Sequence, residues 1–180
     1  MTPSPHQQSR RMALCGLMAA LSLVVLLMGG LIPLATFACP MLAMICLLPV
    51  LRECGAGLCL VLYAAVSVLA LLLVPDKELA AFYLFFGFYP ALRPELNRLP
   101  GRFPRTAAKC GVFTASMVCM YLLLLKLFRL EAVAEEFAGY SPLMTAGLLL
   151  LGNVTLLLFD RALDRLALLY ERKLRGRFFR

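Results

Sequence analysis

The sequence predicts an all-α integral membrane protein, a six-helix transmembrane bundle with both termini in the cytoplasm. Three observations support this prediction. The chain of 180 residues is 62% hydrophobic, with a mean hydropathy of +0.87. Residues 12–51 carry no formal charge, and such a stretch is long enough for two helical crossings of the hydrocarbon core. The Lys and Arg residues gather in short connections between apolar stretches, where they orient transmembrane helices.

Six apolar stretches are the predicted spans. They are Met12–Ile32, Thr36–Leu51, Gly55–Val74, Leu79–Leu92, Cys110–Leu125 and Ser141–Phe159. Pro33 ends the first stretch, and Pro40 and Pro49 are expected to kink or shorten the second. The fourth stretch is short, about 21 Å of helix against a hydrocarbon core of roughly 30 Å. We expect the turn at 75–78 and a snorkelling Arg93 to complete its crossing.

The distribution of basic residues predicts the orientation. With six crossings and a cytoplasmic N-terminus, only Lys77, Lys126 and Arg129 of the 18 Lys and Arg residues remain outside, as the positive-inside rule favours. If the fourth stretch turned back, the basic connection at 93–109 would face outward. We therefore expect one membrane domain over 1–180. It consists of a cytoplasmic tail at 1–11, six spans within 12–160 and a basic cytoplasmic tail at 161–180.

The last span is predicted to continue beyond the membrane as an amphipathic helix. Ser141 and Pro142 form a helix start, and apolar residues then recur at helical spacing through the segment 159–170. Asp160 and Asp164 are expected to pair with nearby arginines on a solvated face. The basic tail is expected to bind anionic lipid, which accounts for the net charge of +8 without nucleic acid as a partner.

No group of residues in the sequence indicates catalysis. The chain has no Gly-rich phosphate loop followed by Lys-Ser/Thr, no HExxH and no GxSxG, so we expect neither an enzyme nor an ATPase. The 7 cysteines include no CxxC pair, and His6 is the single histidine. We expect the cysteines to act as small apolar side chains, with no metal site and no cofactor. No acidic residue lies in the middle of a span, which argues against a proton-driven pump.

Polar and aromatic residues within the spans are the candidate functional groups. Asn153 predicts either a hydrogen bond between helices or a contact to a ligand, and Lys126 either snorkels outward or contacts a ligand. Aromatic residues dominate the segment 82–90. They form either lipid-facing and interfacial packing or a wall against a flat ligand.

Small residues recur at helical spacing on three spans. These ridges let helices approach closely, either inside the bundle or toward a partner. They are Ala13, Gly16 and Ala20 on the first span, Gly55 and Cys59 on the third, and Gly111, Ala115 and Cys119 on the fifth.

The layout resembles the substrate-binding S components of energy-coupling factor transporters. The size, the six spans, the cytoplasmic termini and the opening at 11–22, a basic start followed by an alanine-rich first helix, carry the resemblance. It implies a subunit for uptake of a vitamin or other small molecule across a bacterial cytoplasmic membrane. It also implies a transmembrane coupling subunit, which would dock on Ala13, Gly16 and Ala20, and two ATPase subunits.

The chain departs from that family's pattern on the outer side. It has no Trp, and its first and third connections between spans are short. Any small-molecule site would therefore draw on Tyr83, Lys126, Tyr140 and Asn153. The alternative is a non-transporting membrane scaffold or assembly factor of the cell envelope, because such proteins also have little intramembrane chemistry.

Overall fold

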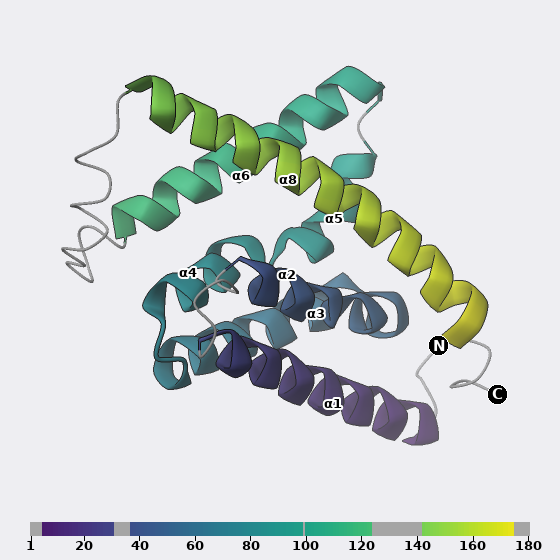
Figure 1. Cartoon of the computed structure of the whole chain (residues 1–180). Helices are drawn as coiled ribbons and strands as arrows, with labels where there is room; N and C mark the ends of the chain where they lie inside the picture. The colour runs from purple at the N-terminus through teal and green to yellow at the C-terminus, as the bar shows by residue number, and fades with distance from the viewer. Residues whose placement is uncertain (1–4, 31–36, 99, 124–141, 175–180) are drawn as a thin grey trace. The chain divides into compact units, whose positions relative to one another are not determined.

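The computed structural model describes residues 5–30, 37–98, 100–123 and 142–174, and all regular secondary structure in them is helical (Figure 1). Four stretches are long and apolar enough to cross a membrane. They are Gln8–Gly29, Leu47–Leu73, Phe103–Leu123 and Ala146–Arg172. The all-α class and the presence of several membrane-length helices are thus confirmed. Six crossings and their orientation stay predictions.

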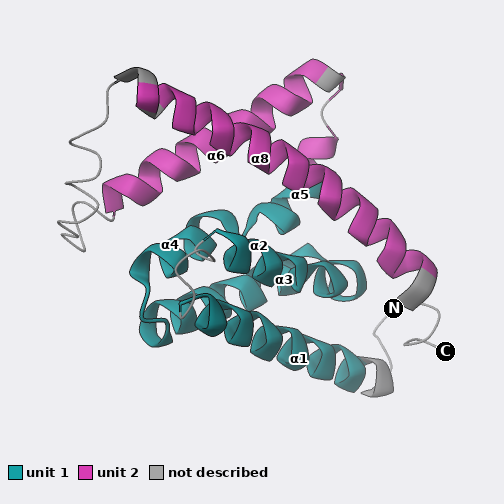
Figure 2. Cartoon of the chain, viewed as in Figure 1, with its two compact units in different colours: residues 1–94 teal, residues 95–180 magenta. Residues whose placement is uncertain are grey.

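The chain divides into two compact units, Met1–Pro94 and Glu95–Arg180 (Figure 2). Each is described by itself below, and the expectation of one membrane domain stays a prediction. The helices of the first unit are α1 (Pro5–Gly29), α2 (Ala38–Ile45), α3 (Leu47–Leu73), α4 (Lys77–Phe86) and α5 (Tyr89–Asn97), the last of which continues past the boundary between the units.

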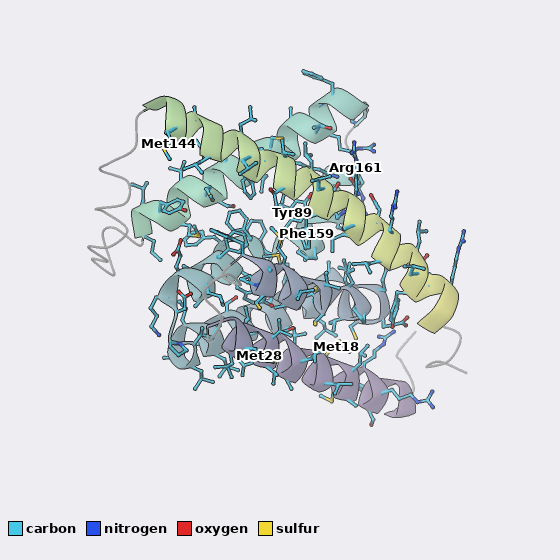
Figure 3. All side chains as sticks on the ribbon, viewed as in Figure 1. Met18, Met28, Tyr89, Met144, Phe159 and Arg161 are labelled. Atoms are coloured by element: carbon cyan, nitrogen blue, oxygen red, sulfur yellow. The ribbon has the colours of Figure 1, made fainter. Side chains whose placement is uncertain are left out.

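In the first unit, α2 and α3 each pack against both α1 and α4. The core consists of side chains from all four helices, among them Leu26, Met44, Leu47, Val50, Val66, Ala70, Leu79 and Tyr83. Many other apolar side chains of these helices are exposed, such as Met28, labelled in Figure 3. Exposed apolar side chains on a long helix are the expected lipid-facing surface of a membrane bundle.

Three helices of the first unit end four residues before a proline. Pro33 follows the end of α1 at Gly29, Pro49 follows the end of α2 at Ile45, and Pro90 follows the end of α4 at Phe86. A proline has no amide hydrogen for the carbonyl four residues earlier, and its ring clashes with that carbonyl. The predicted second and fourth spans are consequently broken: α2 is about 12 Å long and α4 about 15 Å.

Helix α3 contains a break of its own at Gly55, whose backbone has φ 87° and ψ 172°. Glycine adopts this conformation without the steric cost that a side chain would bring. The break lies at the predicted start of the third span. The segment 47–54 therefore corresponds, together with α2, to the predicted second span.

The turn between α3 and α4 is closed by side chains on both sides. Asp76 caps α4 by accepting hydrogen bonds from the amides of Glu78 and Leu79. The ammonium group of Lys77 donates to the carbonyls of Leu71 and Val74 at the end of α3. The turn at 75–78 thus adds helix before the fourth apolar stretch, as predicted. Arg93, expected to snorkel, is instead buried in α5.

The second unit contains α6 (Arg102–Leu123) and α8 (Pro142–Leu169), which is followed by a π-helical turn, Tyr170–Leu174. Helix α6 begins eight residues before the predicted fifth span, because Gly101 turns the chain at φ 96° and Pro104 is tolerated in the first helical turn. Helix α8 begins at Pro142 and continues unbroken well past Phe159, so its predicted helical extension is confirmed.

Candidate functional site

Tyr83 is the predicted ligand contact in the first unit, and its side chain is completely buried. Its ring lies 6.0 Å from that of Tyr63 on α3. Next to it on α4, Phe82 contacts Phe86 with ring centroids 4.5 Å apart and Phe37 with ring centroids 5.3 Å apart. The aromatic residues of α4 therefore pack largely against protein. Of the two alternatives, the lipid-facing one does not hold for Phe82, Tyr83 and Phe86, which are buried.

The hydroxyl group of Tyr83 is buried without a hydrogen-bond partner. Polar groups around it belong to Ser22, Cys46 and Cys59, and the Ser22 hydroxyl donates to the Ala43 carbonyl. By contrast, the neighbouring Tyr63 hydroxyl donates to the carbonyl of Leu84. An unpaired buried hydroxyl costs stability. A ligand or water that accepted a hydrogen bond from it would remove that cost.

Asn153 is the predicted ligand contact in the second unit. Its amide nitrogen donates to the hydroxyl of Thr114 on α6 at 3.2 Å and to the carbonyl of Leu149 on its own helix at 2.9 Å. Its carbonyl oxygen is buried without a hydrogen-bond partner. The interhelical hydrogen bond, one of the two predicted roles of Asn153, is therefore confirmed, while a ligand contact stays a prediction.

The four predicted ligand residues are not assembled into one site by the described structure. Tyr83 belongs to the first unit and Asn153 to the second. Lys126 and Tyr140 lie outside the described residues.

The predicted docking ridge on α1 lies on the surface. Ala13, Gly16 and Ala20 are all exposed, and a methyl group added at Gly16 would meet no atom within 4 Å. The ridge on α6 is equally exposed at Gly111, Ala115 and Cys119. Neither ridge is used for packing within its unit. The alternative of internal packing holds only at Cys59 on α3, which is buried.

An ion pair joins the two long helices of the second unit. The Nζ atom of Lys109 on α6 lies 2.6 Å from Oδ2 of Asp160 on α8, and both side chains are nearly inaccessible, with exposed fractions of 6% and 10%. Asp160 is therefore buried and not on the expected solvated face, while its pairing with a nearby arginine stays a prediction. Its neighbour Arg161 does point to the surface, as Figure 3 shows.

Sequence reasoning missed this pair because its members are 51 residues apart. One signal was available. Opposite charges stabilise a helix when they lie three or four residues apart, but no acidic residue has that spacing from Lys109 and no basic residue has it from Asp160. A charge next to an apolar span without a local counter-ion must find its partner on another helix.

The thiols offer no assembled metal site in the part of the chain that the structure describes. All seven cysteines are free thiols, and the sulfur atoms of Cys15 and Cys54 lie 3.8 Å apart. No group of three or more His, Cys, Asp or Glu side chains among the described residues could hold a metal ion.

No protein-family model, curated protein or solved structure matches this chain. The fold defines the class of protein: in the part of the chain that the structure describes, all regular structure is helical and four helices are of membrane-spanning length, which is consistent with a membrane location.

Proposed function

We propose that the chain is a multi-pass protein of a bacterial cytoplasmic membrane, with six crossings and both termini in the cytoplasm. Three of the membrane-length helices supply one crossing each, and the part of α3 after its break at Gly55, residues 56–73, supplies a fourth. Helix α2 with the segment 47–54, about 25 Å of helix, and α4 with α5, about 30 Å, supply the other two as broken helices. This arrangement keeps the basic connection at 93–109 in the cytoplasm, as the positive-inside rule favours.

The proposed function is that of a substrate-binding subunit in an energy-coupling factor type uptake transporter. The observation that carries this proposal is the exposed ridge on α1. Ala13, Gly16 and Ala20 leave a shallow strip of surface, and small residues in a membrane helix let a partner helix approach closely. A transmembrane coupling subunit is the proposed occupant. Two ATPase subunits would supply the energy, since this sequence has no nucleotide-binding motif.

A small molecule is the proposed cargo, bound by Tyr83, Lys126, Tyr140 and Asn153. Two of these residues support the assignment through unpaired buried atoms: the hydroxyl of Tyr83 and the carbonyl oxygen of Asn153. The Tyr83 hydroxyl would be satisfied by a hydrogen-bond acceptor on a ligand, and the Asn153 carbonyl oxygen by a hydrogen-bond donor. The proposal requires that the ligand site open to the outer side, so that a bound molecule can enter from there.

Affinity purification of the full chain in mild detergent tests the proposal. We expect a transmembrane coupling subunit and two ATPase subunits to copurify. The variant Gly16→Leu should lose them, because its side chain fills the ridge. The matched control Gly57→Leu should keep them, since Gly57 is also exposed with no atom within 4 Å of an added methyl group, but lies on α3. Absence of these partners from the unmodified protein would contradict the proposal.

A membrane scaffold or assembly factor is the second candidate function. The observation that favours it is the packing of Phe82, Tyr83 and Phe86, whose burial against protein leaves no aromatic wall open to a ligand. In the same purification, cytoskeletal or wall-synthesis proteins would then copurify in place of the ATPases. The exposed ridges on α1 and α6 would serve as docking surfaces in this case too.

A further inference from the structure

The ion pair between Lys109 and Asp160 lies where both long helices of the second unit change from polar to apolar sequence. Lys109 directly precedes the apolar stretch that begins at Cys110, and Asp160 directly follows the one that ends at Phe159. The two charges are in direct contact at 2.6 Å and nearly inaccessible. Lysine at such a boundary usually extends its ammonium group toward water and headgroups, but here the ammonium group turns to α8.

Neither helix is able to neutralise its charge alone. The residues three and four positions away are Arg105, Thr106, Val112 and Phe113 around Lys109, and Leu156, Leu157, Leu163 and Asp164 around Asp160. Each set contains a residue of like charge and none of opposite charge. Like charges at this spacing destabilise a helix, so attraction across the two helices is what offsets the repulsion within each.

The ion pair is continuous with the rest of the contact between α6 and α8, which cross in Figure 1. About one turn further along α6, Thr114 accepts the hydrogen bond from Asn153. Phe113 packs so closely on Gly152 that an added methyl group there would lie 3.0 Å from its ring. The pair therefore forms the polar end of one antiparallel interface.

Neutralisation of the Lys109 charge changes the length of helix that can lie in the hydrocarbon core. As a helix, the predicted fifth span Cys110–Leu125 would be about 24 Å long, below the roughly 30 Å of a hydrocarbon core. If Lys109 is neutralised, residues 106–109 join it, and a helix over 106–125 would be about 30 Å long. Pairing with Asp160 thus gives the fifth span the length that a crossing requires.

We propose that Lys109 and Asp160 form a charge-neutralising pair that holds 106–109 of α6 inside the hydrocarbon boundary. Formation of the pair couples the depth of α6 to the presence of α8, so that the two helices occupy the membrane as a unit. An isolated charge at this depth is costly in lipid, and each member of the pair removes that cost for the other. This inference does not depend on whether the protein serves a transporter or a scaffold.

The test measures how deeply α6 lies by the reactivity of a cysteine placed on it. Full-length protein with Thr106→Cys, in membranes opened so that both faces are reached, is treated with a charged maleimide that cannot enter lipid. Phe103→Cys, one turn closer to the helix start and 86% exposed, is the matched control. Labelling of the seven native cysteines is measured in the parent protein and subtracted.

We expect the Thr106→Cys variant to react at least tenfold more slowly than the Phe103→Cys variant. Addition of Asp160→Asn should raise its rate toward that of the control, because the unpaired Lys109 moves to water and draws α6 outward. Addition of both Lys109→Met and Asp160→Asn should restore the slow rate, since neither position 109 nor position 160 then carries a charge to solvate.

Equal rates at the two positions in the otherwise unmodified protein would overturn the proposal without any change to the pair. A Thr106→Cys rate that stays slow with Asp160→Asn alone, or that stays fast in the combined variant, would overturn it as well. If the Asp160→Asn protein does not accumulate, the combined variant still decides: accumulation with slow labelling supports neutralisation, and failure to accumulate contradicts it.

Discussion

The two units of this protein differ in the contacts that join the helices within each unit. In the first unit, close packing of apolar and aromatic side chains joins four helices, and the Tyr83 hydroxyl is left without a hydrogen bond. In the second unit, two long helices meet through an ion pair and a hydrogen bond, Lys109–Asp160 and Asn153–Thr114. Lipid tails are as apolar as leucine, so helices in a membrane associate through tight packing or polar contacts. The second unit combines the two means, since Phe113 also packs closely on Gly152.

Tight packing in the first unit is most sensitive to added volume, and Gly29 at the end of α1 is its tightest position. A methyl group added there would lie 2.5 Å from the Cβ of Cys39 and 2.8 Å from Leu79. We expect Gly29→Ala to lower the free energy of unfolding by about 3 kcal/mol, since overpacking forces the backbone to shift. Thermal unfolding followed with a dye that fluoresces on reaction with thiols would measure the loss.

The matched control for this prediction is Gly16→Ala on the same helix. An added methyl group at Gly16 meets nothing within 4 Å, and alanine favours a helix over glycine by about 0.5–1 kcal/mol. We therefore expect the control to unfold at the same temperature as the unmodified protein or slightly higher. Equal destabilisation by the two substitutions would mean that α1 does not pack on α2 and α4 as described.

The two tyrosines of the first unit sharpen the comparison, because they differ in one hydrogen bond. Tyr63 donates to the carbonyl of Leu84, whereas the hydroxyl of Tyr83 has no partner. We expect Tyr63→Phe to destabilise the protein by about 1 kcal/mol, and Tyr83→Phe to stabilise it by a similar amount because an unsatisfied buried group is removed. Unfolding midpoints of the two variants would show shifts of opposite sign.

The same pair of variants addresses the proposed ligand site. If the hydroxyl of Tyr83 contacts a small molecule, Tyr83→Phe should weaken binding while it raises the stability of the protein without ligand. If Tyr83→Phe raised both the stability of the protein and the uptake of the small molecule, the Tyr83 hydroxyl would not be a ligand contact. Loss of stability in Tyr83→Phe would show that the hydroxyl has a partner and would contradict the arrangement described here.

Local rules predicted much of the fold. Prolines predicted the end of the first span and the shortening of the second, because the effect of a proline reaches only four residues back along the chain. The turn at 75–78 likewise predicted additional helix before the fourth apolar stretch, a helix that Asp76 caps, whereas the end of α4 before Pro90 was missed. The early start of α6 was missed, since the charged residues between Arg102 and Lys109 read equally well as a connection or as an amphipathic first turn.

The candidate site was less predictable, because its contacts join residues far apart in the sequence. Composition identified Asn153 as a residue that needs a partner, but nothing local indicates Thr114 as that partner. The pairing of Lys109 with Asp160 and the exposure of Gly16 depend on which helix faces lie together. A hydrophobic pattern that is apolar all around the helix does not encode those faces.

The smallest expected effect is at the hydrogen bond between α6 and α8. The Asn153 amide donates across the interface to Thr114, whereas the hydroxyl of Thr155, two residues away and exposed, donates only to the carbonyl of Leu151 on its own helix. Hydrogen bonds between membrane helices contribute about 0.6 kcal/mol on average. We expect Asn153→Leu to cost about that much in reversible unfolding by mixed detergents, and Thr155→Val to cost nothing measurable. A contrary result would be that Asn153→Leu leaves the free energy of unfolding unchanged by itself and lowers it only together with Asp160→Asn. That result would mean that the ion pair is sufficient to hold α6 against α8 and that the Asn153 amide matters only when the pair is absent.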